Sequence, residues 1–343
     1  MNFPGYKYKR DLSIDTDALV GLIAASQRTN GEIPWCAGQK TDPWAHVEAA
    51  MGLTIGGRYE AARRAFQWLQ TTQLTDGSWY AAYLDGVPRD RTRDSNLTAY
   101  IAVGLYHYYR VTGDEDFIVA LWPTMARAMD FAVGLQTAEG SICWALDPDG
   151  KVDPMALLTG SSSIYMSLNC ALALARLLGK SQPNWDAARD KLARAIRHKR
   201  PLFNMTKSRF SMDWFYPVLT GVLTGGDARR RIDKYWKKFV VEGLGVRCVF
   251  DEPWVTVAET CELVLALTAM GHTELAGIVF GWISDKCFED GTYWCGFTFP
   301  DMVIWPEEKI TWTNAVVLMA LDALFQLTPA HDLFSPGFGR GRR

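Results

Sequence analysis

The chain has 343 residues, of which 48% are hydrophobic and 22% charged, and its formal net charge at pH 7 is −2. A chain of this length can bury one large core or two ordinary ones. The near-zero charge gives no electrostatic reason to bind nucleic acid or an anionic membrane, so neither partner is expected.

The cysteines and the N-terminal residues both indicate a cytoplasmic protein. The seven cysteines are odd in number and mostly lie in apolar runs such as NCALALA. That pattern is typical of reduced core thiols rather than of a disulfide framework. The stretch MNFPGYKYKRDLSID carries charges where a signal peptide would have its apolar segment. No apolar run reaches the roughly 18 residues that a membrane-spanning helix needs.

Two kinds of predicted helix alternate along the chain. Glycine after a helix supplies a left-handed cap residue, so AMGLTIGG, YHYYRVTG and ALARLLG mark helix ends. The amphipathic, charged helices are expected at 16–30, 58–73, 114–136, 185–200, 226–241 and 272–286. The helices that are apolar nearly all round are expected at 42–56, 96–112, 161–178, 212–224, 256–270 and 311–325. A charged helix has a solvated face, whereas an apolar helix is buried on every side.

This alternation predicts an all-α fold, the (α/α)6 barrel, in which six inner helices are ringed by six outer helices. Strand signals are nearly absent, so little or no sheet is expected. Two stacked helical bundles are the alternative, but no linker separates them. We therefore expect one barrel domain over residues 1–335, followed by a flexible Gly/Arg-rich tail at 336–343.

The connections from each outer helix to the next inner helix are long and carry the candidate site. They include 74–95, 137–159, 242–255 and 287–310, and they should all emerge at the end where the inner helices begin. Long loops in a compact domain usually carry function. These loops are rich in tryptophan and acids, which suit sugar rings that stack on aromatic faces and hydrogen-bond to carboxylates. The alternative is that the tryptophans fill loop cores while the acids cap helices.

Helix register selects the first candidate catalytic acid. Along 42–56 a stripe of small residues, suited to a crowded barrel axis, runs through Ala45, Ala49, Gly52 and Gly56, and Asp42 heads it. Asp42 is also a plausible N-cap, which is the structural alternative. Because negative charge is favoured near a helix N-terminus, Asp42 is expected to stay ionised and act as a base.

The second candidate acid lies on 256–270, where Glu259 and Glu262 share a helix face with Ala266 and Ala269. Buried acids cost several kcal/mol unless they are paired or hydrogen-bonded. We expect one of the two glutamates to be the protonated catalytic acid, because its neighbour one turn away disfavours a second charge. Carboxylates around an aromatic cleft are typical of glycoside hydrolases. In these enzymes one acid protonates the leaving oxygen, and another activates water or attacks the anomeric carbon.

Residues of the rim loops and inner-helix starts complete the predicted site. The expected substrate-binding residues are Trp44, His46, Trp79, Asp94, Asp213, Trp214, Trp254, Trp294, Glu308 and Trp312. Asp213 and Glu308 remain alternative catalytic acids, Asp94 is also a candidate N-cap, and His46 is equally a candidate core histidine. The five histidines are widely dispersed, so no metal site and no cofactor are expected.

The stretch QTTQLTDGSW at 70–79 resembles the repeat motif of terpene cyclases and prenyltransferases, which are also α/α barrels. That resemblance implies a prenyltransferase-like enzyme as one alternative. The aspartate-rich DxDD and DDxxD signatures of those enzymes are absent from the sequence, and the shared motif is structural in those families, so it says nothing about chemistry here.

A second resemblance favours a glycosidase. The stretch RDSNLTAYIAVGLYHYYRVTGDEDFIVALWPTMARAMDFA looks like the inner–outer hairpin of glucoamylase-like (α/α)6 glycosidases. TDPWAHVEAAMGL and WPEEKITWTNAVVLMALDAL resemble small actinobacterial proteins, often labelled prenyltransferase-like, that include an endo-α-mannosidase of mycobacterial methylmannose polysaccharide metabolism. The resemblance implies hydrolysis of α-1,4-linked mannose chains, with inversion as in most glucoamylase-like barrels. A non-catalytic oligosaccharide-binding barrel is the remaining alternative, and it would need the aromatic cleft without buried acids.

Overall fold

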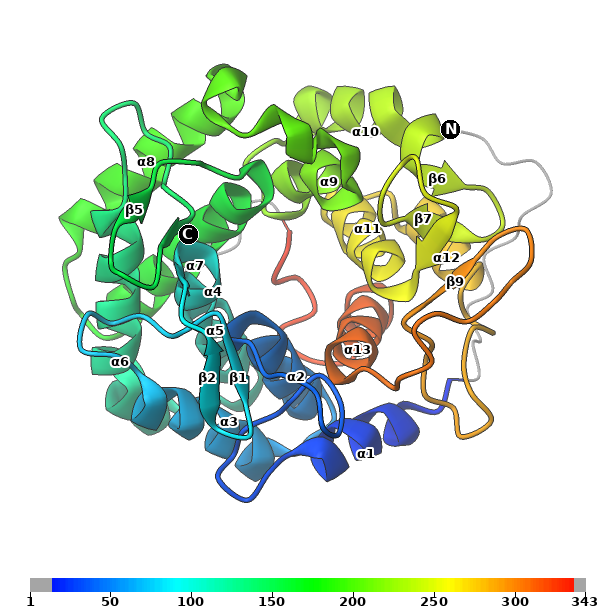
Figure 1. Ribbon diagram of the computed structural model, residues 1–343, viewed down its shortest axis with the longest axis horizontal. Coiled ribbons are helices and arrows are strands. Elements are labelled where there is room, and N and C mark those ends of the chain that lie inside the picture. Colours follow the sequence, from blue (N-terminus) through cyan, green and yellow to red (C-terminus); the bar gives the residue numbers. More distant parts are fainter. Residues whose placement is uncertain (1–13, 336–343) are drawn as a thin grey trace.

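The computed structural model describes residues 14–335, and its helices form two concentric rings (Figure 1). The inner ring consists of α2 (Pro43–Ile55), α4 (Ser95–Ala99) with α5 (Ile101–Thr112), α7 (Leu158–Leu177), α9 (Ser211–Leu219), α11 (Val257–Ala269) and α13 (Thr311–Phe325). The outer ring consists of α1 (Thr16–Ser26), α3 (Tyr59–Thr72), α6 (Glu115–Gly134), α8 (Pro183–His198), α10 (Gly225–Phe239) and α12 (Thr273–Gly281). Each inner helix packs on the next, and α13 closes the ring against α2. The predicted (α/α)6 barrel is confirmed.

The two rings differ in burial as their sequences predict. On the inner helices α11 and α13 nearly every residue is buried, whereas the outer helices α3 and α10 bury one apolar face only. Close packing of the inner ring depends on small residues, since a Cβ at Gly52 would lie 2.9 Å from the Cβ of Ala315. Gly52 therefore faces a neighbouring inner helix, whereas a Cβ at Gly56 would meet Val20 of the outer helix α1.

Several boundaries differ from the expectation. The inner segment expected at 96–112 consists of α4 and α5, which meet at Tyr100. Helix α9 ends at Leu219 and α12 at Gly281, each several residues earlier than expected. The final inner helix, α13, has the expected bounds of 311–325. The tail expected at 336–343 lies outside the described residues.

The long rim loops contain short strands that the sequence did not predict. β1 (Ala82–Leu84) pairs with β2 (Val87–Asp90), and β4 (Ala145–Leu146) lies between β3 (Arg93–Asp94) and β5 (Val152–Asp153). A third antiparallel sheet has the order β6 (Val240–Val241), β7 (Gly245–Arg247), β8 (Trp254–Thr256) and β9 (Gly296–Thr298). Strands of two to four residues are too short to show a period-two pattern.

One described helix, α6, is long and apolar enough to cross a membrane by length and composition alone. About 50% of its most apolar window is buried inside the molecule, where α6 packs against α4, α5 and α7. A helix buried in a core passes the same test.

A repeated turn ties each of three outer helices to the next. Near the end of α3, the Gln73 side-chain amide donates to the carbonyl oxygen of Gly77 at 2.8 Å and to that of Thr124, in α6, at 2.8 Å. Gln27 makes the same pair of bonds from α1 to α3, and Gln136 makes it from α6 to α8. The stretch that resembles the terpene cyclase repeat is therefore a structural joint.

The glycine in this joint is required by backbone conformation and by space. Gly77 has a φ of +90°, and a Cβ there would lie 2.4 Å from the carbonyl oxygen of Arg127 in α6. Gly86, in the turn between β1 and β2, has a φ of +74° but no atom within 4 Å of a Cβ. Both positions require a residue that tolerates a positive φ. At Gly77 the nearby backbone of α6 also leaves no space for a Cβ.

We expect Gly77→Ala to destabilise the protein by about 1–3 kcal/mol more than Gly86→Ala. Both variants incur the strain of a positive φ, roughly 1–2 kcal/mol, but in Gly77→Ala the outer helices must also move apart. Denaturant unfolding followed by circular dichroism measures the difference, and equal stabilities for the two variants would contradict this account of the joint.

Candidate active site

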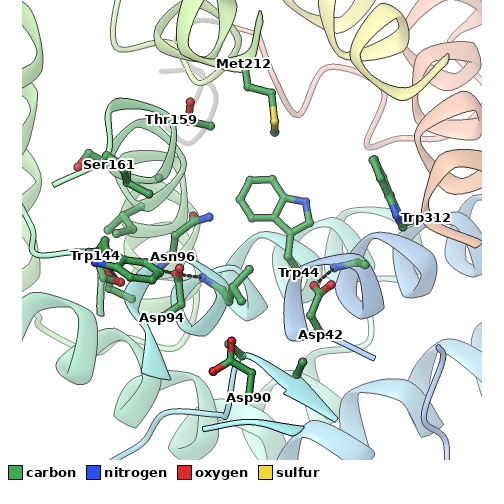
Figure 2. Close-up of a pocket in the computed structure, with 18 of the residues that line it drawn as sticks. Asp42, Trp44, Asp90, Asp94, Asn96, Trp144, Thr159, Ser161, Met212 and Trp312 are labelled. Atoms are coloured by element: carbon green, nitrogen blue, oxygen red, sulfur yellow. Dashed lines mark hydrogen bonds between the residues drawn. The ribbon is translucent and has the colours of Figure 1, made fainter. Parts of the chain in front are cut away.

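A cavity of about 440 Å³ opens where the inner helices begin (Figure 2). Its lining combines indole rings with carboxylates that come from loops and helix starts far apart in the sequence. The tryptophans are Trp35, Trp44, Trp144 and Trp312, and the acids are Asp42, Asp90, Asp94 and Glu262. Figure 2 shows Trp44, Trp144 and Trp312 arranged around the same space, with Asp42 below Trp44.

Asp42 both caps α2 and faces this cavity. Its Oδ1 accepts the Ala45 backbone N–H at 2.9 Å, and its Oδ2 accepts the Trp35 indole N–H at 2.6 Å. Burial raises the pKa of Asp42 above its ordinary value, while the Ala45 hydrogen bond and the Lys40 charge oppose the rise. The capping role and the candidate catalytic role therefore belong to the same carboxylate.

Glu262 lines the cavity from α11 and is almost completely buried. The Tyr216 hydroxyl, from α9, donates to its Oε1. Burial raises the pKa of Glu262 well above its ordinary value, and the charges of Glu48 and Glu259 raise it further. Burial therefore raises the pKa of Glu262 more than the charge of Glu259 does, although the sequence-based expectation rested on that neighbouring glutamate.

Glu259 is also buried, but it does not line the cavity. Its charge acts on Glu48 and on Glu262, so the three carboxylates form one electrostatic cluster near the barrel axis. Of the two glutamates on α11, only Glu262 is placed to meet a substrate in this cavity.

Glu48, on α2, is a member of the cluster that sequence reasoning missed. The Tyr100 hydroxyl donates to its Oε1 at 3.2 Å, and its buried Oε2 has no hydrogen-bond partner among the described residues. Burial raises the pKa of Glu48 to about 8. An acid in the middle of an otherwise apolar inner helix, PWAHVEAAMGLTI, was the available signal.

Aromatic rings join the cavity to the acid cluster. Trp44 stacks on Tyr100 with ring centroids 4.3 Å apart, and Tyr216 lies 5.9 Å from the Trp44 ring. The two tyrosines are the residues that donate to Glu48 and Glu262. Because several carboxyl groups share a dry region, they hold protons more tightly than exposed acids do.

Three of the expected substrate-binding residues, Trp44, Asp94 and Trp312, line the cavity. Asp94 also caps α4, since its Oδ1 accepts the backbone N–H groups of Asn96 at 2.7 Å and Leu97 at 2.9 Å. Burial raises the pKa of Asp94 to about 6.

Three expected substrate-binding residues lie in the core instead. The His46 ring is hydrogen-bonded through both nitrogens, to the Ile33 backbone N–H and the Ala65 carbonyl oxygen, and burial lowers its pKa to about 4. Trp79 is 1% exposed and donates to the Leu69 carbonyl oxygen at 2.9 Å. Trp214 is 2% exposed and stacks on a phenylalanine of α10. For these residues the structure shows the core positions that the structural alternative expected.

The other four lie outside the cavity lining. Asp213 pairs with Arg200 at 2.7 Å. Trp254 packs edge-on against Trp305, and its indole N–H donates to the Trp305 carbonyl oxygen. Trp294 packs against a phenylalanine of β9. Glu308 is exposed.

Several cavity residues were not predicted individually. They include Trp35, Lys40, Asp90, Asn96, Trp144, Thr159, Ser161 and Met212. The two tryptophans lie in the aromatic, acid-rich stretches that the sequence marks as rim loops. The small polar residues carry no distinguishing signal in the sequence.

Comparison with known proteins identifies a close relative. No family model matches the chain. The MMP endo-(1,4)-3-O-methyl-α-D-mannosidase of Mycolicibacterium hassiacum is 48% identical over 312 residues, which cover 91% of this chain and 86% of that enzyme.

Solved structures share the fold at low sequence identity. A D-mannose isomerase aligns with a TM-score of 0.72 and 11% identity over 95% of this chain and 100% of that one. A wild-type glycosidase aligns with a TM-score of 0.69 and 15% identity over 92% of this chain and 96% of that one. At these identities the likeness supports the barrel fold alone.

We expect Glu48→Gln to stabilise the protein increasingly as pH rises. The folded-state pKa of Glu48 is about 8, against an ordinary value of 4.5. Between these values the unfolded chain has lost a proton that the folded protein retains, so stability falls with rising pH. Glutamine removes that dependence and resembles the protonated acid.

Thermal unfolding at pH 4, 6 and 8 should show the variant's gain over the original chain growing with pH. Glu289→Gln, at an exposed loop position, is the matched control and should change little. A gain from Glu48→Gln that does not vary with pH would contradict the burial of a protonated carboxyl group.

Proposed function

The chain belongs to the family of the Mycolicibacterium hassiacum MMP endo-(1,4)-3-O-methyl-α-D-mannosidase, and on this premise we propose that it cleaves α-1,4-linked, partly 3-O-methylated mannose chains internally. It is a glycoside hydrolase with an (α/α)6 barrel. The observation that carries the proposal is the meeting of two buried carboxyl groups, Asp42 and Glu262, in one cavity walled by tryptophans.

The aromatic walls suit a methylated sugar chain. The C–H faces of a pyranose ring, and a methyl group on its oxygen, gain contact with an indole face that a charged wall would not provide. Trp44, Trp144 and Trp312 offer such faces around the cavity (Figure 2). Asp90 and Asn96, in the same lining, offer polar atoms for the free hydroxyl groups.

Glu262 is assigned as the general acid. Its raised pKa favours the protonated form, and it can give this proton to the glycosidic oxygen as the bond to C1 breaks. Tyr216 donates to Oε1 of Glu262, which leaves Oε2 to carry the proton. The nearby charge of Glu259 also favours this protonation state.

Asp42 is assigned as the general base. Its hydrogen bonds from Trp35 and Ala45 and the charge of Lys40 favour the ionised form. A water oxygen attacks C1 while Asp42 accepts the water proton, so the products carry one new hydroxyl group at each cut end. Attack by water on the face opposite the leaving oxygen inverts C1 and requires the two carboxyl groups to be about 6.5–9.5 Å apart.

Two other functions were considered from the sequence. A prenyltransferase-like function was suggested by residues 70–79, which form a structural joint between outer helices. A non-catalytic sugar-binding barrel would gain nothing from acids that burial makes costly, such as Glu48 and Glu262. Both observations support hydrolysis over these alternatives.

We expect Asp42→Asn and Glu262→Gln each to lower kcat by about 10²–10⁴-fold on methylmannose polysaccharide, because each removes one proton-transfer group. Glu308→Gln, at an exposed rim position, is the control and should retain near-normal turnover. Oligosaccharide analysis after incubation with methylmannose polysaccharide, amylose or yeast mannan measures both rate and substrate choice. Near-normal turnover of either active-site variant would show that the acids are misassigned.

The same reaction followed by NMR reports the stereochemistry. Inversion requires the first-formed reducing end to be the β anomer, and an initial α anomer would replace the proposed water attack with a covalent route. Tight binding of the polysaccharide without any cleavage would instead favour the non-catalytic barrel.

We also expect Lys40→Met to move the acidic limb of the kcat/KM profile to higher pH. The Lys40 charge lowers the pKa of Asp42, so its removal makes the base protonate at higher pH as the solution is acidified. The basic limb, set by Glu262, should stay in place. Lys151→Met, at an exposed loop position, is the control, and an unchanged acidic limb in Lys40→Met would remove Asp42 from the role of base.

A further inference from the structure

A second cavity, of about 270 Å³, lies between the end of α8 and the outer helix α10. The 3₁₀ segments η1 (Arg200–Leu202) and η2 (Met205–Arg209) and the start of α9 complete its walls. It shares no lining residue with the aromatic cavity, and the proposed hydrolysis does not use it.

The lining of this second cavity is strongly basic. Its cationic side chains are Arg197, Arg200, Arg231 and Lys238, whereas Asp213 is the one acid among its described lining residues. Four positive charges against one negative charge leave a formal local charge of +3. This excess contrasts with the net charge of −2 for the whole chain.

Two of the guanidinium groups are fixed by the fold. Arg200 pairs with Asp213 at 2.7 Å, and Arg231 donates to the backbone carbonyl oxygens of Trp214 at 2.7 Å and Asp213 at 2.6 Å. Burial lowers the pKa of Arg231, and the like charge of Arg200 lowers it further. The two cations therefore repel each other at short range, and one carboxylate does not neutralise both.

Unused donors remain in the cavity lining. Arg200 Nη1 is buried and has no hydrogen-bond partner among the described residues. A buried donor without a partner is costly, and more so when it is charged. Arg197 Nε donates a hydrogen bond to the Val222 carbonyl oxygen, and Lys238 Nζ donates one to the Ser208 carbonyl oxygen. An arginine has five N–H donors and a lysine three, so further donors are free to bind a ligand.

We propose that this cavity binds a small molecule through a doubly charged oxyanion group, either a phosphate or a pair of carboxylates. Planar guanidinium groups bind both kinds of oxyanion through paired hydrogen bonds, and such charge-assisted bonds are the strong ones. The lining also includes apolar side chains such as Leu223 and Met205, which favour a compact organic anion over a polyanion. The volume admits a ligand of a few heavy atoms beyond the charged group.

The site adjoins the aromatic cavity through one wall. Asp213 accepts the Thr159 hydroxyl at 3.3 Å, and Thr159 lines the aromatic cavity (Figure 2). Met212, the residue before Asp213, lines it as well. One residue, Asp213, therefore links Arg200 to Thr159 in the lining of the aromatic cavity.

Calorimetric titration with inorganic phosphate and with succinate, at constant ionic strength, tests the proposal. We expect 1:1 binding of at least one anion, weakened tenfold or more in the double variant Arg197→Gln/Lys238→Gln. Arg200 and Arg231 are left intact because they hold Asp213 and the start of α9. The double variant Arg194→Gln/Lys237→Gln changes exposed cations of the same helices outside the cavity, and it should bind as the original chain does.

The outcomes separate clearly. Tighter binding of phosphate identifies a phosphate ligand, and tighter binding of succinate identifies a dicarboxylate. Absence of binding of both anions to the original chain would overturn the proposal. Equal affinity in the two double variants would also overturn it, because the anion would then bind without the help of Arg197 and Lys238. Circular dichroism of each variant confirms that the helices are retained.

Discussion

The joint between successive outer helices is the constraint on which the site depends. In each of three joints a glutamine amide binds the carbonyl oxygen of a glycine in its own turn and a carbonyl oxygen of the next outer helix. The joint fixes where the outer helix ends and where the rim loop begins. Because α2, α4 and α7 each follow such a loop, their N-termini lie at the same end of the barrel. The acids and indoles that those starts carry are thereby brought into one cavity.

Placing acids in the barrel axis opposes stability and favours chemistry. Glu48 and Glu262 lie among apolar inner helices, where burial makes their ionised forms unfavourable. The hydroxyl groups of Tyr100 and Tyr216 offset part of that cost by hydrogen bonding. The remaining penalty appears as raised pKa values, which is the property that a general acid needs near neutral pH. Burial of these two glutamates thus both lowers the stability of the folded protein and raises the pKa of their carboxyl groups.

The structure brings some of the predicted site residues together in one cavity and leaves others outside it. Helix periodicity places a residue on the inner or outer ring, and it selected Asp42 and the pair Glu259 and Glu262. Of these three acids, Asp42 and Glu262 line the same cavity. Periodicity could not decide the direction in which an individual aromatic side chain points. Trp79 and Trp214 occur beside acids in rim-like stretches, yet both are buried in the core, because helices distant in sequence leave space for their rings there.

The sequence by itself predicted the barrel, since two concentric rings bury alternating apolar and amphipathic helices and no linker separates two bundles. It also determined that α13 spans 311–325 and that Asp42 begins an inner helix. The tertiary structure alone decided that Glu48 joins the acid cluster and that Arg197, Arg200 and Arg231 share a second cavity. Those groupings arise between elements far apart in the chain, and the interaction of two charges depends on a distance in space that spacing along the sequence does not contain.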